Sequence, residues 1–107
     1  MNVLFVCSRN QWRSPTGEKV WRNRAGLSTR SAGTSRSAQR KVSMADIRWA
    51  DVIMAMEQKH KDRLTTDFKR IQEHAIIHVL NIPDDYQYMD PELVEHFEAV
   101  VPLLLEL

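Results

Sequence analysis

One cysteine of this chain is followed six positions later by an arginine, and the residues between them are polar or aromatic. Cys7 and Arg13 bracket Ser8-Arg9-Asn10-Gln11-Trp12, and Ser14-Pro15 follows directly. A cysteine thiolate is a strong nucleophile, and a guanidinium can donate two parallel hydrogen bonds to a phosphate or a similar oxyanion. The pair therefore predicts nucleophilic chemistry at phosphorus, in which Cys7 attacks and Arg13 supports the transferred group.

The residues between Cys7 and Arg13 are predicted to form a loop that binds the oxyanion. Backbone N–H groups of such a loop, with the N-terminus of the following helix, create a positive potential that favours the thiolate of Cys7. Ser14 is placed to donate its hydroxyl to the sulfur, and Asn10 is a residue type that tolerates a left-handed turn. The predicted substrate-binding residues of the loop are Ser8, Arg9, Asn10, Gln11, Trp12 and Ser14.

Three carboxylates near the C-terminus are candidates for the acid that protonates a leaving oxygen. Asp84 and Asp85 follow a predicted buried strand, so they lie at the sheet edge where the phosphate loop also opens. Asp90 precedes Pro91 at the start of an amphipathic helix, where a role as the helix N-cap accounts for an aspartate without any catalytic role. We predict Asp84 as the general acid, with Asp85 as the second choice and Asp90 as the third.

The elements that must position these residues alternate between strands and helices. Short apolar runs predict strands at Val3–Val6, Leu27–Ser31, Asp51–Met56 and Ala75–Leu80. Helices are predicted from Pro15 to about Ala25, over Met44–Trp49 and Glu57–Leu64, and from Asp90-Pro91-Glu92 onward, with Ser14 as the N-cap of the first. This order predicts an α/β fold, a four-stranded parallel sheet with helices on both faces and the phosphate-binding loop after the first strand. We expect one domain over residues 1–107.

Charge is unevenly distributed along the chain, although the formal net charge is only +1. Residues 9–48 hold ten Lys or Arg and two Asp or Glu, whereas residues 49–107 hold five and twelve. A basic half is typical of a protein that binds phosphate esters or nucleic acid. No RNA-binding aromatic signature accompanies the arginines, so nucleic acid is the less favoured partner. A dipolar, solvated surface explains the asymmetry equally well.

The remaining composition excludes several classes of site. With a single cysteine, the chain forms no intramolecular disulfide and no cysteine-rich zinc site, and its free thiol suits the reducing cytoplasm. No apolar run approaches the roughly 20 residues of a membrane span, so we expect a soluble protein without membrane contact. The four histidines show no metal-ligand spacing, so we predict neither a metal nor a cofactor.

Several stretches resemble the low-molecular-weight protein tyrosine phosphatases, in order along almost the whole chain. They are Val3-Leu4-Phe5-Val6-Cys7 with Asn10 and Arg13-Ser14-Pro15, then Ser31-Ala32-Gly33-Thr34, Ala50-Asp51-Val52-Ile53-Met54-Ala55-Met56 and Ile82-Pro83-Asp84-Asp85-Tyr86. The resemblance implies a phosphocysteine mechanism without metal, in which Cys7 attacks phosphorus, an Asp protonates the leaving oxygen and water hydrolyses the intermediate. It also implies that Tyr86 stacks on an aryl phosphate.

His60 falls where this family has a residue that supports the phosphate loop. The resemblance therefore allows a hydrogen bond from His60 to Asn10. The helical pattern of its own segment instead favours a surface histidine, which is the interpretation we prefer.

The loop departs from the family at positions that set substrate choice. Ser8 and Gln11 stand where the family often has apolar residues, Arg9 replaces a glycine, and Trp12 replaces a second cysteine. These changes weaken the expectation of phosphotyrosine specifically. The predicted partners are therefore a phosphorylated protein or a small aryl or alkyl phosphate, with inorganic phosphate or another oxyanion in the loop.

Three other functions compete with a phosphatase. An arsenate reductase of this architecture relays oxidation through further cysteines, and this chain has none, so an intramolecular relay is excluded. Reduction by an external thiol is left open. Cysteine phosphocarriers lack the Cys-x5-Arg-Ser pattern that Cys7, Arg13 and Ser14 form in this chain. Arg13 therefore argues against this function. A catalytically weak phosphate-binding module is left open by the sequence.

Overall fold

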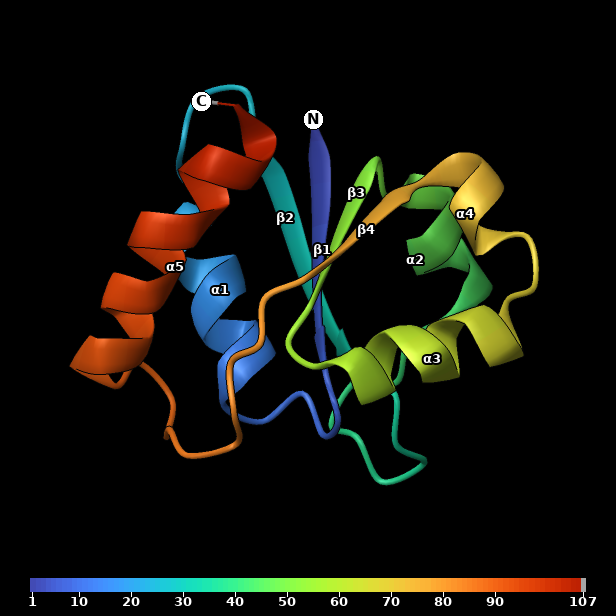
Figure 1. The fold of residues 1–107 in the computed structure, drawn as a ribbon, viewed down its shortest axis with the longest axis horizontal. Helices are drawn as coiled ribbons and strands as arrows, with labels where there is room; N and C mark the ends of the chain where they lie inside the picture. The colour runs from blue at the N-terminus through green and yellow to red at the C-terminus, as the bar shows by residue number, and fades with distance from the viewer. Residues whose placement is uncertain (107) are drawn as a thin grey trace.

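The computed structural model describes residues 1–106, which form a four-stranded parallel sheet between two layers of helices (Figure 1). The strands are β1 (Asn2–Cys7), β2 (Ser28–Gly33), β3 (Val52–Ala55) and β4 (Ile76–Val79). They lie in the order β2-β1-β3-β4, and each neighbouring pair is parallel. The predicted sheet is therefore confirmed.

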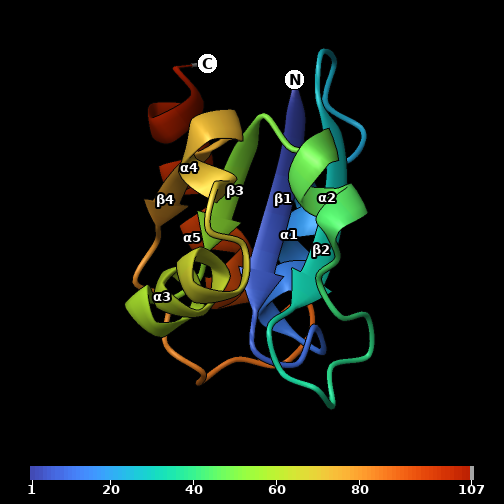
Figure 2. The same ribbon diagram turned by 90° about the vertical axis from the view of Figure 1, so that its right-hand side faces the viewer.

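Helices cover both faces of the sheet, as predicted (Figure 2). On one face lie α1 (Arg13–Trp21) and α5 (Pro91–Leu105). On the other face lie α2 (Met44–Trp49), α3 (Gln58–Asp67) and α4 (Ile71–His74). Within residues 1–106, no helix has the length and apolar character needed to cross a membrane.

The central strand β1 is buried on both faces, and its side chains alternate between two hydrophobic clusters. Val3, Phe5 and Cys7 belong to the cluster under α1 and α5, whereas Leu4 and Val6 belong to the cluster under α2, α3 and α4. This alternation follows from the two-residue period of a strand, and burial on both faces explains the continuous apolar run. It also directs Cys7 toward the α1 side of the sheet.

The first helix differs from the prediction at both ends. It begins at Arg13 rather than Pro15 and ends at Trp21 rather than near Ala25. Ser14 therefore lies inside the first turn, and the prediction that it is the N-cap is wrong. Its hydroxyl bonds the phosphate loop instead, and Trp12 occupies the N-cap position without a side-chain hydrogen bond.

The other elements match the prediction apart from shifts at their ends. Strand β2 continues two residues past its predicted end at Ser31, to Gly33, and α3 continues past Leu64 to Asp67. The short helix α4 was not predicted. The predicted N-cap of the last helix is confirmed, because the carboxylate of Asp90 accepts a hydrogen bond of 2.9 Å from the backbone N–H of Glu92.

The parallel direction of the strands brings the loops after them to one end of the sheet, the lower end in Figure 1. Strand β1 lies between β2 and β3, where the chain crosses from one side of the sheet to the other. Open α/β sheets place ligand sites at such a switch point. The segments that follow β1, β3 and β4 meet there.

Candidate active site

A hollow of about 110 Å³ opens at the carboxyl end of β1. It is lined by Cys7, Ser8, Arg9, Gln11, Trp12, Arg13 and Asp84. The structure thus brings together the three residues that we predicted to be catalytic, Cys7, Arg13 and Asp84. Cys7 and Arg13 are almost fully buried, with 3% and 2% of their surface exposed, so the nucleophile and the cation lie at the base of the hollow.

Two buried polar residues support the loop from behind. Asn10 has a left-handed φ of 52°, as expected for its residue type, and its Oδ1 accepts a hydrogen bond of 2.9 Å from Ser14 Oγ. The same Oγ lies 3.0 Å from Cys7 Sγ. A thiolate at Cys7 has no proton to donate, and Ser14 has a single hydroxyl proton, so in that state this proton turns from Asn10 to the sulfur. Neither Asn10 nor Ser14 lines the hollow, so their contribution is to shape the loop and stabilise the sulfur.

The guanidinium of Arg13 is fixed by groups that follow β3 and β4. Its Nη1 donates to Glu57 Oε1 at 2.6 Å and to the backbone carbonyl of Ile82 at 2.8 Å. These bonds use both N–H groups of Nη1. The Nε and Nη2 groups, which form the opposite edge of the guanidinium, present the parallel pair of donors that matches an oxyanion.

Glu57 is a member of this site that the sequence analysis missed. Burial raises the pKa of Glu57, but the hydrogen bond from Arg13 and the charge of Arg13 outweigh burial and bring the pKa below its ordinary value. Glu57 is therefore ionised at neutral pH and pairs with Arg13. The sequence predicts Glu57 only as the start of a helix. Its position directly after a buried strand, at the same sheet edge as Cys7, was the signal that could have identified it.

His60 is buried, with 1% of its surface exposed, so the preferred prediction of a surface histidine is wrong. Its Nδ1 lies 3.0 Å from the backbone N of Glu57, and its Nε2 lies 2.8 Å from Ser8 Oγ. A backbone N–H only donates, so Nδ1 is the acceptor and the ring proton is on Nε2. His60 thus supports the loop through Ser8, and the predicted bond to Asn10 is not the contact it makes.

The protonation state of His60 sets the direction of the Ser8 hydroxyl. Burial, followed by the charge of Arg13, lowers the pKa of His60 from its ordinary 6.5 to about 4, so the ring is neutral at neutral pH. The neutral ring donates its Nε2 proton to Ser8 Oγ. The hydroxyl proton of Ser8 is then available to an acceptor in the hollow, which Ser8 lines.

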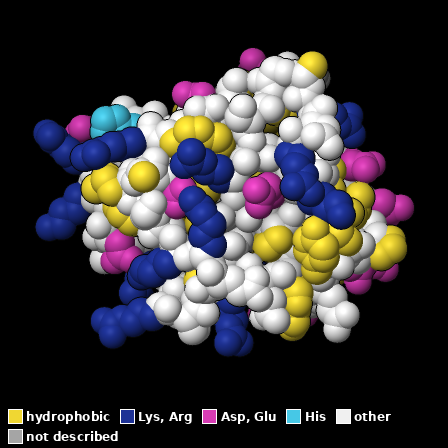
Figure 3. Space-filling view, turned by 180° about the vertical axis from the view of Figure 1, so that it is seen from behind, with side chains coloured by type: hydrophobic (Ala, Val, Ile, Leu, Met, Phe, Trp, Pro, Cys, Tyr) yellow, Lys and Arg dark blue, Asp and Glu magenta, His cyan; other side chains and the backbone are white. Residues whose placement is uncertain are grey.

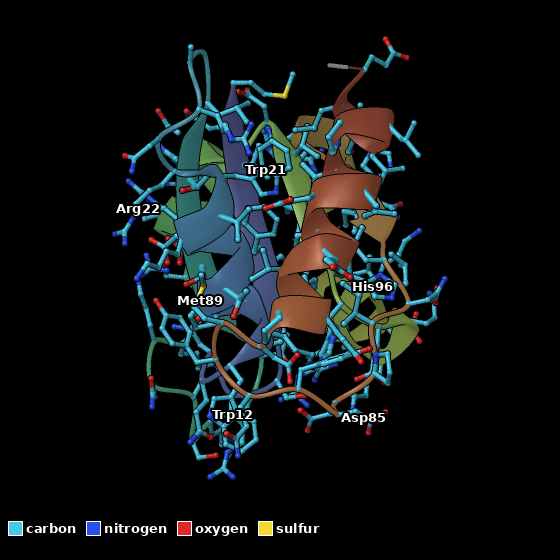
Figure 4. The ribbon with its side chains drawn as sticks, turned by 90° about the vertical axis from the view of Figure 1, so that its left-hand side faces the viewer. Trp12, Trp21, Arg22, Asp85, Met89 and His96 are labelled. Atoms are coloured by element: carbon cyan, nitrogen blue, oxygen red, sulfur yellow. The ribbon has the colours of Figure 1, made fainter. Side chains whose placement is uncertain are left out.

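The three candidate acids occupy different places. Asp84 lines the hollow, and its Oδ1 lies 3.6 Å from Arg13 Nε. Asp85 is exposed and does not line the hollow, and Figure 4 shows it on the loop before α5, away from Trp12. Asp90 caps α5. Of the three carboxylates, only Asp84 is at the site.

The aromatic side chain at the hollow is Trp12, which is 37% exposed. Figure 4 shows Trp12 at the end of the molecule where the loops lie. Tyr86 is half-buried, packs against the core under α1 and α5, and does not line the hollow. Across residues 1–106, no three His, Cys, Asp or Glu side chains are grouped in a way that could hold a metal ion.

Comparisons with known proteins identify the fold. No family model matches this chain, and no curated protein matches it in sequence. The low molecular weight protein tyrosine phosphatase from T. tengcongensis superposes with a TM-score of 0.81 at 19% identity, over 99% of this chain and 98% of that one. The tyrosine phosphatase Wzb from Escherichia coli K30, in complex with phosphate, gives 0.76 at 19% identity, over 98% and 96% of the two chains.

A third solved structure with this fold is that of an arginine phosphatase. The YwlE arginine phosphatase from Geobacillus stearothermophilus superposes with a TM-score of 0.73 at 20% identity, over 98% of this chain and 93% of that one. At such identities the likeness extends to the architecture, over nearly the whole of each chain. This protein has the fold of the low molecular weight protein tyrosine phosphatases.

Proposed function

We propose that this protein is a phosphomonoester hydrolase of the tyrosine-phosphatase type that acts through a phosphocysteine intermediate on Cys7. One observation carries the proposal. The guanidinium of Arg13 is hydrogen-bonded on one side to Glu57 and to the carbonyl of Ile82, beside a buried cysteine. Its Nε and Nη2 edge makes no hydrogen bond within residues 1–106, and Asp84 Oδ1 lies 3.6 Å from Nε at the rim of the same hollow. Donors fixed before substrate binds stabilise transition-state charge without reorganisation.

In the first step, the Cys7 thiolate attacks the phosphorus of a bound monoester. The S–P bond forms as the P–O bond to the leaving group breaks, and Asp84 gives its proton to the leaving oxygen. Arg13 and the Ser8 hydroxyl donate to the phosphoryl oxygens. This role of Ser8 is supported by its bond from neutral His60, which leaves the hydroxyl proton available.

In the second step, the Asp84 carboxylate takes a proton from water as that water attacks the phosphocysteine. The S–P bond breaks, inorganic phosphate leaves, and the electron pair returns to Cys7 as a thiolate, which Ser14 stabilises by a hydrogen bond. Asp84 at the rim supports hydrolysis over the phosphocarrier alternative, because a carrier needs no group that activates water.

The substrate class that we propose is a phosphorylated protein or an aryl phosphate. An aromatic leaving group has a surface to pack on, because Trp12 is exposed beside the hollow. The buried free thiol of Cys7 suits a reducing compartment, so we place the activity in the cytoplasm.

Turnover of para-nitrophenyl phosphate by the wild type and by Cys7→Ser tests the proposal. We expect the wild type to be active and Cys7→Ser to lose turnover while still binding vanadate or phosphate, because a serine hydroxyl is far less ionised than a thiol. Residual turnover of the variant above a few per cent of wild type would exclude Cys7 as the nucleophile. Peptides carrying phosphotyrosine, phosphoserine or phosphoarginine then define the substrate class.

A further inference from the structure

A second, wider hollow adjoins the candidate active site and is bordered by arginines. We call it the arginine groove; it is lined by Ser8, Arg9, Thr34, Ser35, Arg36 and Arg63. Its volume is about 830 Å³, and it is open to solvent. Because Ser8 and Arg9 line both hollows, a ligand can extend from the site of Cys7 directly into the groove.

The wall of this groove is fixed relative to the phosphate loop by backbone hydrogen bonds. Thr34 N–H donates to the carbonyl of Cys7 at 3.0 Å, and Ser35 N–H donates to the carbonyl of Ser8 at 2.9 Å. Farther along, Gln39 N–H donates to the carbonyl of Arg9 at 2.9 Å. The segment that carries Arg36 therefore keeps its place beside the loop.

The positive charge of the groove is only partly neutralised. Arg9, Arg36 and Arg63 are exposed, and Arg63 forms an ion pair of 2.9 Å with Asp67. No carboxylate within residues 1–106 lies at ion-pair distance from Arg9 or Arg36. Seen from behind, Lys and Arg side chains gather on the side of the molecule formed by α2 and along the lower edge, where the loops lie (Figure 3).

We infer that the arginine groove binds acidic residues beside the phosphorylated residue of a protein substrate, so that the preferred substrates are phosphopeptides rich in Asp and Glu. The inference rests on the proposed function. An extended peptide advances about 3.3 Å per residue, so carboxylates within a few residues of a phosphate seated at Cys7 reach the groove. The residues that line the groove include no aromatic side chain, which disfavours a single-stranded nucleic acid because its bases need stacking surfaces.

Binding measurements on Cys7→Ser test the inference without requiring turnover. Two fluorescein-labelled phosphotyrosine peptides are compared by anisotropy at low salt, one with Asp and Glu flanks and one with Gln and Asn flanks. We expect the acidic peptide to bind about tenfold more tightly, since an exposed ion pair changes affinity by up to about fivefold. The preference falls to about threefold or less when Arg36→Ala and Arg63→Ala are added, and it weakens as salt rises.

The matched control is Arg22→Ala. Arg22 is exposed at the end of α1, far from Trp12 and the loops (Figure 4), so its loss should leave the preference unchanged. Equal affinity for the two peptides, or a preference that survives loss of both groove arginines, overturns the inference. It is also overturned if a single-stranded oligonucleotide binds more tightly than the acidic peptide and loses affinity in the double variant.

Hydrolysis of para-nitrophenyl phosphate separates this inference from the proposed function. This small ester does not reach the groove, so Arg36→Ala with Arg63→Ala, in a chain that keeps Cys7, should retain the wild-type kcat/KM. A loss of tenfold or more would mean that these arginines serve the phosphate site, and it would overturn the inference. Failure of the wild type to hydrolyse any phosphomonoester contradicts the phosphatase proposal, whereas the peptide comparison on Cys7→Ser still decides the specificity of the groove.

Discussion

At the level of single residues, the hydrogen bonds of Arg13 show that the site depends on the planar shape of the guanidinium as well as on its charge. Both hydrogens of Nη1 are donated to Glu57 and to the carbonyl of Ile82, and the other edge forms a planar fork. A lysine carries the same charge as a single ammonium, which cannot satisfy the two protein acceptors and also present a parallel pair of donors.

Arg13→Lys should therefore lower kcat/KM for para-nitrophenyl phosphate by about a hundredfold or more, the scale seen when a transition-state donor is removed. Arg22→Lys, at the distant end of α1, is the control for the chemical change itself. Circular dichroism melts of both variants report whether the fold is kept. Near-normal kinetics in a folded Arg13→Lys would mean that the arginine is structural.

The assignment of the general acid is tested by its dependence on the leaving group. The acid protonates an oxygen as it leaves, so Asp84→Ala should slow hydrolysis of phenyl phosphate much more than that of a dinitrophenyl ester, whose leaving group needs no proton. Asp85→Ala, one residue away but outside the hollow, should affect both esters little. The assignment is wrong if Asp85→Ala or Asp90→Ala shows the leaving-group effect and Asp84→Ala does not.

Residue types and spacing identified the part of the site that lies close together in sequence. Cys7, Arg13 and the left-handed Asn10 belong to one loop, so their geometry follows from the loop itself. Glu57 and His60 reach that loop only because β3 lies beside β1, and the sequence separation of Arg13 and Glu57 is 44 residues. Periodicity also suggested an exposed His60, because the pattern of α3 does not reveal a polar partner such as Ser8.

At the level of elements, β2 and the loop after β1 are packed without room for a side chain at Gly33. A Cβ on Gly33 would lie 2.6 Å from the carbonyl oxygen of Ser8 and 2.6 Å from Ala38 Cβ. Gly33→Ala should therefore displace the phosphate loop, lowering kcat/KM at least about tenfold and costing roughly 1–3 kcal/mol in the free energy of unfolding. Kinetics and urea denaturation measure the two effects.

The double variant Gly33→Ala with Ala38→Gly is the matched control. It removes the contact with Ala38 but keeps the contact with the Ser8 carbonyl. Activity should remain low in this variant, since the carbonyl belongs to the loop backbone and cannot turn away as a side chain would. Recovered activity would assign the effect to Ala38.

The order and type of the elements were predictable where the apolar residues formed either a continuous run or a helical repeat. Strands β1 and β3 follow from continuous apolar residues, and α5 follows from its helical repeat and the cap at Asp90. The start of α1 was not predictable from Ser14-Pro15, because the hydroxyl of Ser14 bonds Asn10 and Cys7 across the loop. Helix α4 is a single turn, too short to produce a recognisable period.

For the whole molecule, burial of His60 makes stability depend on pH. The native pKa of His60, about 4, lies below its ordinary value of 6.5, so the unfolded chain binds an extra proton between these limits. The free energy of unfolding is therefore at its full value above about pH 6.5 and decreases as pH falls toward 4. The loss is at most roughly 3 kcal/mol, by the conversion of pKa units to free energy.

His60→Gln removes this titration while keeping a polar side chain. We expect the melting temperature of the wild type to fall between pH 6.5 and 4.5 more steeply than that of the variant. The lowered pKa of Glu57 contributes only below its ordinary 4.5, so this window isolates the histidine. Parallel slopes for the two proteins would show that His60 is protonated without cost in the native state.

The backbone hydrogen bonds between residues 34–39 and the phosphate loop also determine how substrate recognition can change during evolution. The three bonds to the carbonyls of Cys7, Ser8 and Arg9 are made by main-chain N–H groups, so they do not depend on which side chains the segment carries. Selection, or a randomised library at positions 35, 36, 37 and 39, can therefore exchange one set of recognition residues for another while the nucleophile stays in register. The segment is a natural point for evolving new substrate preferences on an unchanged catalytic frame.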